Sequence, residues 1–410
     1  MASRASDERA IAPFDVSDET RFVKDNWHEQ FAQLRAEMPV SYCPDSAFGP
    51  YWSVVTHDLI SKVELDHQTY SSSYALGNIT ITDPPSESNL QNFIAADPPV
   101  HTAQRKVIQP AFNPSQMRMR EEQVRPFCSD LLDGIPIGET FDWVDRVSVE
   151  QAIGMLCILF DMPHSDLTDL RRWSDYAGGV SAEHMTDEWR AEWMAQMQQM
   201  LARFDELMDD KRGQEPGDDL LSRMVHSDAM GNLNPLERLS NIALLIVGGN
   251  DTTRNSMSGL VLALHQFPDA LEKLRADPSL IPNAAQEIIR WQSPVLHMRR
   301  TTTCDTELGG QHIAKGEKVV MWYNSANRDE AIFPNGDAFD VARDNARRHL
   351  GFGHGIHRCV GARLAEIQIG TLIEEIVNRG WRITPQDGIE RLSSPFLRGI
   401  TKLPVKVEAA

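Results

Sequence analysis

The chain has few cysteines, and no spacing organises them into a known pattern. Its 410 residues include five cysteines, an odd number at scattered positions, with no Cys-x-x-Cys among them. Disulfide frameworks need paired cysteines and structural zinc sites need closely spaced ones, so both are excluded. Scattered unpaired thiols are typical of a reducing compartment, and we expect a cytoplasmic protein. The five are Cys43, Cys128, Cys157, Cys304 and Cys359.

The chain also lacks an excess of basic charge and any long apolar run. Forty Lys and Arg against 59 Asp and Glu give a formal net charge of −19. This charge argues against nucleic acid and against anionic membrane surfaces as partners. No run of about 18 apolar residues could span a bilayer. Residues 1–24 are charged and have no apolar core, so we expect neither a signal peptide nor a membrane anchor.

The pattern of apolar residues predicts a mainly α fold with a small β part. Helical periodicity dominates after residue 100, whereas β-like runs are short, at 51–56, 311–320 and 403–407. This distribution differs from the alternating units of a parallel α/β sheet. There is no internal repeat, and the one clear linker is 213–219, which contains Gly and Pro between two helical stretches.

One cysteine lies in a distinctive loop, Phe-Gly-His-Gly-Ile-His-Arg-Cys-Val-Gly, at residues 352–361. Cys359 directly precedes a helical pattern at 360–378, and Gly380 is the expected stop signal. Unpaired N–H groups and the helix dipole favour a thiolate at such a position. The glycines at 353, 355 and 361 leave room for backbone to approach a flat group. A thiolate offered to a planar cofactor predicts the axial ligand of a haem.

Two other interpretations of Cys359 remain open from the residues alone. A buried structural cysteine is common, but it does not need three neighbouring glycines. The other interpretation is a catalytic nucleophile paired with His357. Side chains two residues apart on an extended stretch point the same way, but they need not touch.

A long helix carries the next signal. Asn234 is an expected N-cap, Pro235 the first helical residue, and no proline follows until Pro268. About 33 residues would extend roughly 50 Å. Gly248 and Gly249 stand in its middle, followed by the polar residues 250–253. A helix tolerates this when a kink or a ligand compensates, so either a flexible hinge or a ligand groove is indicated.

The loop order Phe-Gly-x-Gly-x-His-x-Cys-x-Gly resembles the cysteine loop of the cytochrome P450 family, and the long helix carries that family's glycine-x-acid-threonine pattern. The resemblance implies one P450 haem domain over residues 1–410, with a helix-rich lobe, a smaller β-rich lobe and no fused reductase. It implies haem b as cofactor, Cys359 as iron ligand, and a monooxygenase that uses O₂. A haem-thiolate sensor would not need the acid–threonine pair, and a peroxide-driven haem enzyme commonly lacks it.

The resemblance also implies roles for individual residues. The acid and the alcohol that deliver protons are Asp251 and Thr252. Arg300 is preferred over Arg299 as a propionate ligand, and Glu287, Arg290 and Arg343 resemble the family's structural cluster. The cofactor-binding residues it implies are His101, Arg105, Gly248, Arg300, Phe352, His357, Cys359 and Gly361.

Three blocks resemble the bacterial branch that hydroxylates terminal methyl groups of alkanes and related linear chains: residues 248–255, residues 287–300 and the Asp-Pro-Pro pairs at 83–85 and 97–99. The expected substrates are medium-chain alkanes or fatty acids, and the alternative is the side chain of a sterol or terpenoid. Methionines 185, 194, 197 and 200 indicate either an entry lid for an apolar substrate or ordinary helical packing. The expected substrate-binding residues are Tyr74, Leu76, Ile79, Leu244, Leu296 and Phe396.

The chain contains no flavin or nicotinamide module, so the resemblance implies electrons from an acidic iron–sulfur ferredoxin with a separate ferredoxin reductase. Between Arg343 and Arg363 there are five arginines and one acid, Asp344. This run predicts a basic patch beside Cys359 that would steer an acidic partner.

Overall fold

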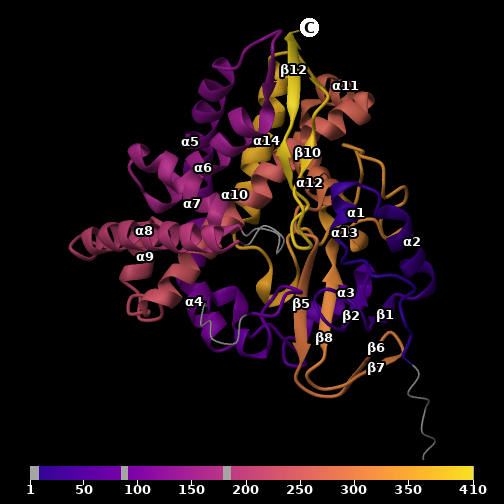
Figure 1. Cartoon of the computed structure of the whole chain (residues 1–410). Coiled ribbons are helices and arrows are strands. Elements are labelled where there is room, and N and C mark those ends of the chain that lie inside the picture. The colour runs from indigo at the N-terminus through magenta and orange to yellow at the C-terminus, as the bar shows by residue number, and fades with distance from the viewer. Residues whose placement is uncertain (1–8, 85–90, 179–185, 410) are drawn as a thin grey trace, which may run out of the picture.

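Helices make up most of the molecule. The computed structural model describes residues 9–84, 91–178 and 186–409. In Figure 1 helices α5 to α9 form one side of the molecule, and β1, β2, β5 and β8 lie with the N-terminal helices on the other. The prediction of a mainly α fold with a small β part is confirmed.

The longest helix, α10 (Pro235–Gln266), has 32 residues and begins with a capping box. The Asn234 side chain accepts hydrogen bonds from the backbone N–H groups of Leu236 and Glu237, and the Glu237 side chain accepts from the Asn234 N–H. The predicted start of the helix is therefore confirmed. Helices α6, α7, α8, α11, α12 and α14 pack against α10, so it runs through the helical lobe.

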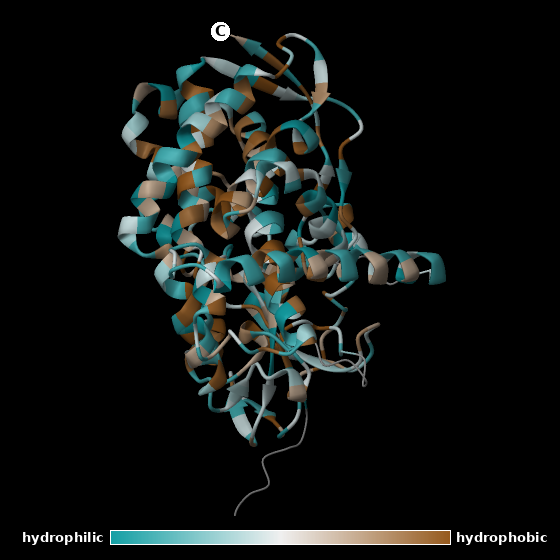
Figure 2. Cartoon of the chain, turned by 90° about the vertical axis from the view of Figure 1, so that its left-hand side faces the viewer, coloured by the Kyte–Doolittle hydropathy of each residue, from teal (hydrophilic) through white to brown (hydrophobic). Residues whose placement is uncertain are grey.

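The other helices vary in length from one to seven turns. Their bounds are α1 (Thr20–Val23), α2 (His28–Glu37), α3 (His57–Leu65), α4 (Val100–Ile108), α5 (Pro114–Asp133), α6 (Glu150–Phe160), α7 (Leu167–Ala177), α8 (Asp187–Arg212), α9 (Leu220–Val225), α11 (Pro268–Ala276), α12 (Ile281–Gln292), α13 (Tyr323–Ala326) and α14 (Ala362–Asn378). Figure 2 shows polar and apolar residues interleaved along them, the pattern of helices with one buried face.

The main sheet has five strands in the order β1-β2-β8-β5-β3. Only β2 and β8 pair in parallel, and the residues of both strands are buried. A three-stranded sheet has the order β4-β12-β9, and β6 with β7 and β10 with β11 form two small pairs. The bounds are β1 (Val40–Cys43), β2 (Tyr51–Val54), β3 (Tyr70–Ser71), β4 (Thr140–Asp142), β5 (His297–Thr302), β6 (Thr306–Leu308), β7 (Gln311–Ile313), β8 (Lys318–Trp322), β9 (Trp381–Pro385), β10 (Glu390–Arg391), β11 (Ile400–Lys402) and β12 (Pro404–Ala409).

Three sequence expectations can be compared with these elements. The linker at 213–219 does connect α8 to α9. The run at 311–320 was wrong as one strand, because a turn at Gly316, with φ +86°, separates β7 from β8. The helix expected from 360 begins at Ala362, and Gly380 follows it with φ +66°, as a helix stop requires.

A fully buried ionic cluster ties the end of α12 to the segment before the cysteine loop. Arg290 forms a two-pronged contact with Glu287, at 2.7 and 2.8 Å, and Arg343 contacts the same carboxylate at 3.0 Å. Both guanidinium groups also donate to backbone carbonyls of residues 334–338. The cluster predicted from the sequence is therefore present, and its charges are compensated by hydrogen bonds.

Within the described ranges, no helix combines the length and the apolar composition that crossing a membrane requires.

Candidate active site

A large cavity lies between α10 and the loop of residues 351–361. Its volume is about 1040 Å³, which exceeds the usual range of sites for one small ligand. Segments from α3, α6, α8, α10 and α14 and the stretch 74–84 also line it. The space suits a flat cofactor together with a substrate.

Cys359 lines this cavity and is held by its own loop. Its backbone N–H donates to the Phe352 carbonyl at 2.8 Å, and its thiol has accessible surface because it faces the cavity. Burial inside the protein raises the pKa of the thiol, while the Gly361 backbone N–H, Arg105 and Arg358 act in the opposite direction. The groups at the helix start and in the loop therefore act in the direction that the sequence predicts, and burial opposes them in the chain alone. No group of three or more metal-binding side chains exists among the described residues.

The glycines of the loop have different roles from those expected. Gly353 and Gly355 adopt left-handed conformations, with φ +66° and +65°. A Cβ on Gly355 would lie 2.3 Å from the Glu64 carbonyl oxygen, so this glycine lets α3 approach the loop. A Cβ on Gly361 would make ordinary contacts, 3.7 Å from Phe112 and 4.0 Å from the Cys359 sulfur. The idea that all three clear space for a flat group was thus wrong for Gly355, whereas Gly353 and Gly361 line the cavity.

The two glycines of α10 face different surroundings. A Cβ on Gly248 would meet nothing within 4 Å, because this residue faces the cavity. A Cβ on Gly249 would lie 2.7 Å from the Leu156 side chain, so this residue lets α6 pack closely. Thr252, one turn after Gly248, also lines the cavity and donates its hydroxyl hydrogen to the Gly248 carbonyl at 2.8 Å.

Asp251 lies on another face of α10 and does not line the cavity. It is 1% exposed, and its carboxylate is 2.6 Å from Arg254, which in turn is 3.1 Å from Asp175 on α7. Burial raises the pKa of Asp251 to about 6, and Asp175 adds to this, while Arg254 lowers it. Asp175 is largely exposed, so a row of charged groups leads from the buried acid to the surface.

The polar residues around Asp251 are held by neighbouring elements. The Asn255 side chain donates to the Asp251 carbonyl at 2.7 Å and accepts from the Ile400 N–H at 2.8 Å. Asn250 donates to Ser174 on α7 at 2.7 Å. Because α10 is continuous and the Asn250 and Asn255 amides are hydrogen-bonded to neighbouring groups, the structure does not support a flexible hinge here.

Cationic and imidazole groups gather beside the cysteine loop. Arg105, Arg300 and His357 line the cavity, and the buried His101 lies with its ring centre 4.2 Å from that of His357. Burial, together with the nearby Arg105, lowers the pKa of His101 to about 4. Burial, together with Arg300, lowers the pKa of His357 to about 2. All four ring nitrogens are buried and have no hydrogen-bond partner among the described residues. Buried orphan nitrogens next to arginines fit a group with two carboxylates, such as a haem.

Arg299 and Arg300 point to different surroundings. Arg300 lines the cavity and donates to the Arg299 carbonyl at 2.8 Å. Arg299 is not among the lining residues, and its guanidinium contacts Asp83 at 2.5 Å. The geometry favours Arg300 for a carboxylate in the cavity.

Four of the six expected substrate residues line the cavity: Tyr74, Ile79, Leu244 and Phe396. Leu296 does not; it is fully buried in a separate core with Trp322 and Val320. Leu76 also does not, since its side chain is 45% exposed while its carbonyl accepts from Thr301. These two predictions were wrong. The sequence reasoning missed lining residues on distant helices, among them Phe93, Leu156, Leu159, Trp189, Trp193 and Leu236.

The structure does not support the predicted methionine lid for the three methionines that it describes. Met185 lies outside the described residues, Met197 and Met200 are buried in the main core, and Met194 is exposed. From the same helix, Trp189 and Trp193 line the cavity instead.

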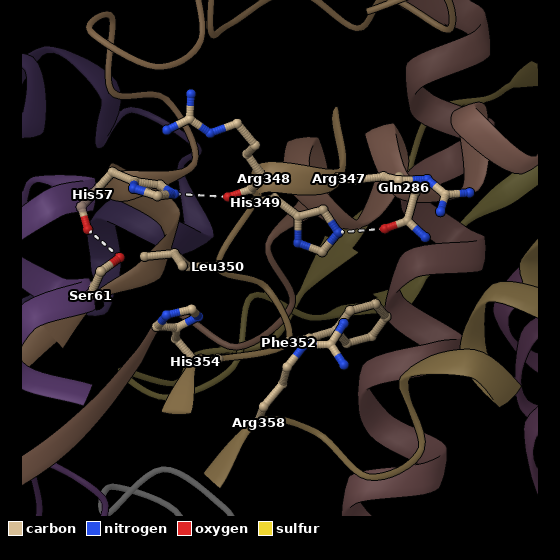
Figure 3. Close-up of a pocket in the computed structure, with 11 residues that line it drawn as sticks. His57, Ser61, Gln286, Arg347, Arg348, His349, Leu350, Phe352, His354 and Arg358 are labelled. Atoms are coloured by element: carbon tan, nitrogen blue, oxygen red, sulfur yellow. Dashed lines mark hydrogen bonds between the residues drawn. The ribbon is translucent and has the colours of Figure 1, made fainter. Parts of the chain in front are cut away.

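A second pocket, of about 240 Å³, lies beside the same loop and carries three arginines and three histidines. Figure 3 shows the guanidinium groups of Arg347, Arg348 and Arg358 spread around it. None of the three forms an ion pair with a described residue. The expected patch is smaller than predicted, because Arg343 is buried against Glu287 and Arg363 pairs with Glu366 at 2.9 Å. The histidines are His57, His349 and His354.

Known proteins are similar to this chain in fold and in sequence over most of its length. The profile of the family described as Cytochrome P450 matches residues 122–408. Linalool 8-monooxygenase of Pseudomonas putida is 38% identical over 389 residues, covering 92% of this chain and 95% of that protein. The methyl-branched lipid omega-hydroxylase of Mycobacterium tuberculosis is 34% identical, covering 92% and 90%. The solved structure of cytochrome P450-153 from Novosphingobium aromaticivorans superposes with a TM-score of 0.90 at 48% identity, covering 96% and 99%.

The chain therefore belongs to the cytochrome P450 family. Within that family it is similar to bacterial enzymes, and it is a monooxygenase whose family implies a haem cofactor.

Proposed function

We propose that the enzyme hydroxylates the terminal carbon of a linear aliphatic chain, such as a medium-chain alkane or fatty acid. Bound haem b supplies the activation of O₂ and the insertion of one oxygen atom into a C–H bond. Cys359 would hold the iron, and Phe352, Gly248 and Gly361 line the cavity that would take the haem. His101, Arg105, Arg300 and His357 would hold the two propionates. The full chain acts as one haem domain that takes its electrons from a separate protein.

The observation that supports terminal specificity is the set of apolar side chains lining the cavity that Gly248 also faces. Leu244 lies one turn before Gly248, and Phe396 enters the same cavity from the segment before β11. Secondary C–H bonds are weaker than terminal ones, so a terminal product requires a shape that holds the chain end at the reactive position. The name of the omega-hydroxylase relative supports the same regiochemistry.

Product analysis on medium-chain alkanes and fatty acids tests this proposal, with mainly terminal alcohols expected. Binding is expected to strengthen by up to about 0.8 kcal/mol per added CH₂ until the cavity is full. Leu244→Ala and Phe396→Ala should raise the share of subterminal alcohols, because the smaller side chains widen the cavity and hold the chain end less firmly. Leu76→Ala is the matched control and should leave the product distribution unchanged, since that side chain lies outside the cavity.

Mainly subterminal products, or turnover of bulky ring compounds alone, would contradict a linear-chain specificity. The second candidate, a terpenoid or sterol side chain, has the 38% identity to linalool 8-monooxygenase in its favour. Competition between a linear alkane and a branched terpenoid alcohol separates the two candidates by their kcat/KM ratio.

Arg190 provides a way to distinguish fatty acids from alkanes. It lines the cavity from α8, away from the cysteine loop, and its only ion pair among the described residues is to Asp187, at 3.3 Å. An exposed pair of this kind contributes little, so the guanidinium is available to a substrate carboxylate. Arg190→Ala should raise KM for a fatty acid about two- to fivefold and leave the alkane KM unchanged.

The proposed electron donor is an acidic ferredoxin that docks beside the cysteine loop. Arg347, Arg348 and Arg358 supply unpaired positive charge there, within a chain of net charge −19. Such a local field raises association rates with an acidic partner and is screened by salt.

The rate of reduction should fall steeply as ionic strength rises. Arg348→Glu or Arg358→Glu should lower it about tenfold at low salt, measured by stopped-flow absorbance of the haem. Arg382→Glu on β9 is the matched control, because Arg382 is exposed and has no ion pair with a described residue. A rate independent of both salt and the two substitutions would remove the docking proposal.

A further inference from the structure

Glu64, near the end of α3, is a buried acid whose role is not explained by packing. Its side chain is 1% exposed. One oxygen accepts a hydrogen bond from the Tyr323 hydroxyl at 2.5 Å and lies 3.7 Å from Arg300. The other oxygen is buried and has no hydrogen-bond partner among the described residues. Since an unpartnered buried carboxylate oxygen is costly, this position needs a physical reason.

The surroundings of Glu64 bring the pKa of its carboxyl group close to neutral pH. Burial raises the pKa of Glu64 to about 7, while Arg300, the Tyr323 hydroxyl and the His354 backbone N–H lower it from the value that burial alone would give. Arg300 comes from β5 and Tyr323 from α13, and the cysteine loop contributes the His354 N–H. Tyr323 stays protonated, because burial and Glu64 raise its pKa well above the ordinary value.

Glu64 is connected to the cofactor site through one shared cation. It lines the same cavity as Arg300, which faces the space assigned above to a propionate. A Cβ on Gly353 would lie 3.4 Å from the hydrogen-bonded oxygen of Glu64, so the acid also touches the loop that carries Cys359. Negative charge added at the cofactor therefore changes the electrostatic potential at Glu64, because both groups interact with Arg300 and little water separates them.

We propose that Glu64 is a positioning residue that couples reduction of the haem to uptake of a proton near neutral pH. This rests on the haem site proposed above. Reduction adds one electron, supplied by the external donor, and Glu64 takes one proton from solvent, which restores the local charge balance. Oxidation returns the electron to an acceptor and the proton to solvent. Glu64 acts through Arg300 and does not touch the reacting atoms.

The direction of the pH dependence follows from this linkage. Reduction makes the site more negative, so it raises the pKa of Glu64, and a protonated Glu64 stabilises the reduced form. The midpoint potential should rise as pH falls toward about 7 and level off below it, where Glu64 is protonated in both forms. Well above that range the reduced form also loses the proton, and the dependence should level off.

Spectroelectrochemical titration of the purified holoenzyme between pH 5.5 and 9 tests the proposal, each pH value being about half a unit apart. The wild-type midpoint should change with pH around neutrality, and Glu64→Gln should flatten the curve while retaining haem. Tyr323→Phe removes a hydrogen bond that lowers the pKa of Glu64, so it should move the inflection to higher pH. Glu366→Gln is the matched control: Glu366 lies near Cys359 but pairs with Arg363 at 2.9 Å, so only a constant offset is expected.

A purely structural role predicts a different outcome. If the wild-type midpoint is constant with pH, or if Glu64→Gln leaves its pH dependence unchanged, the proposal is overturned. The wild-type titration alone decides this if the glutamine variant does not fold. Failure of the underlying haem site would appear separately, as a wild-type protein without the spectrum of thiolate ligation.

Discussion

Replacing Cys359 with alanine or histidine is expected to abolish the strongly red-shifted Soret band of the reduced carbon monoxide complex. The thiolate is the source of that band, and Cys359 is the one cysteine that lines the cavity within the described ranges. Product formation should fall by at least about 100-fold. Loss of a residue that only supports a metal ligand costs up to about 100-fold in activity, and loss of the ligand itself should cost more. Absorbance spectra and product assays measure the two effects.

Cys304→Ser is the control for this experiment. Cys304 is also an exposed thiol, but it lies in the turn between β5 and β6, away from the cavity. Its loss should leave both spectrum and activity unchanged. Retention of the red-shifted band by the Cys359 variants would show that another group ligates the iron.

Substitutions at Asp251 and Thr252 are expected to separate proton delivery from cofactor binding. Asp251→Asn should lower product formation about 100-fold, as expected for loss of a positioned proton donor, and introduce a solvent isotope effect. Thr252→Ala should keep electron consumption but divert it to hydrogen peroxide, because the hydroxyl that faces the cavity is lost. Haem content and substrate binding should remain normal in both variants.

The pH profile adds a second readout for Asp251. Burial raises its pKa to about 6, so the carboxylate becomes protonated and its pairing with Arg254 weakens as pH falls through that value. Product formation should therefore show an inflection near pH 6 that Asp251→Asn lacks. Asp169→Asn is the matched control, since Asp169 is a partly exposed acid on α7 paired with Arg172 at 2.6 Å. Coupled, normal turnover by both active-site variants would leave the two residues with a structural role only.

Features determined by neighbouring residues could be predicted from the sequence. Asn234, Pro235 and Glu237 act within one helical turn, so the start of α10 could be recognised from the chain alone. The same holds for the Glu287–Arg290 pair, three residues apart. The separation of Asp251 from Thr252 onto different faces also follows from the helical angle of about 100° per residue.

Features determined by distant contacts could not be predicted. Leu296 donates its N–H to the Phe396 carbonyl and accepts from the Tyr323 N–H, and these contacts turn its side chain toward another core. The contact of Arg343 with Glu287, 56 residues away, follows from the family resemblance and not from any local pattern in the chain. Trp189 and Trp193 reach the cavity because of how α8 packs, which the helical pattern does not specify.

A methyl group added at either of the adjacent glycines of α10 would alter the cavity by a different route. A methyl group at position 248 would enter open space and reduce the volume available to a substrate without displacing protein atoms. The same methyl group at position 249 would lie 2.7 Å from the end of the Leu156 side chain, which would have to turn away, and Leu156 itself lines the cavity. A larger residue at position 248 therefore takes up cavity volume directly, whereas one at position 249 changes the cavity by displacing Leu156.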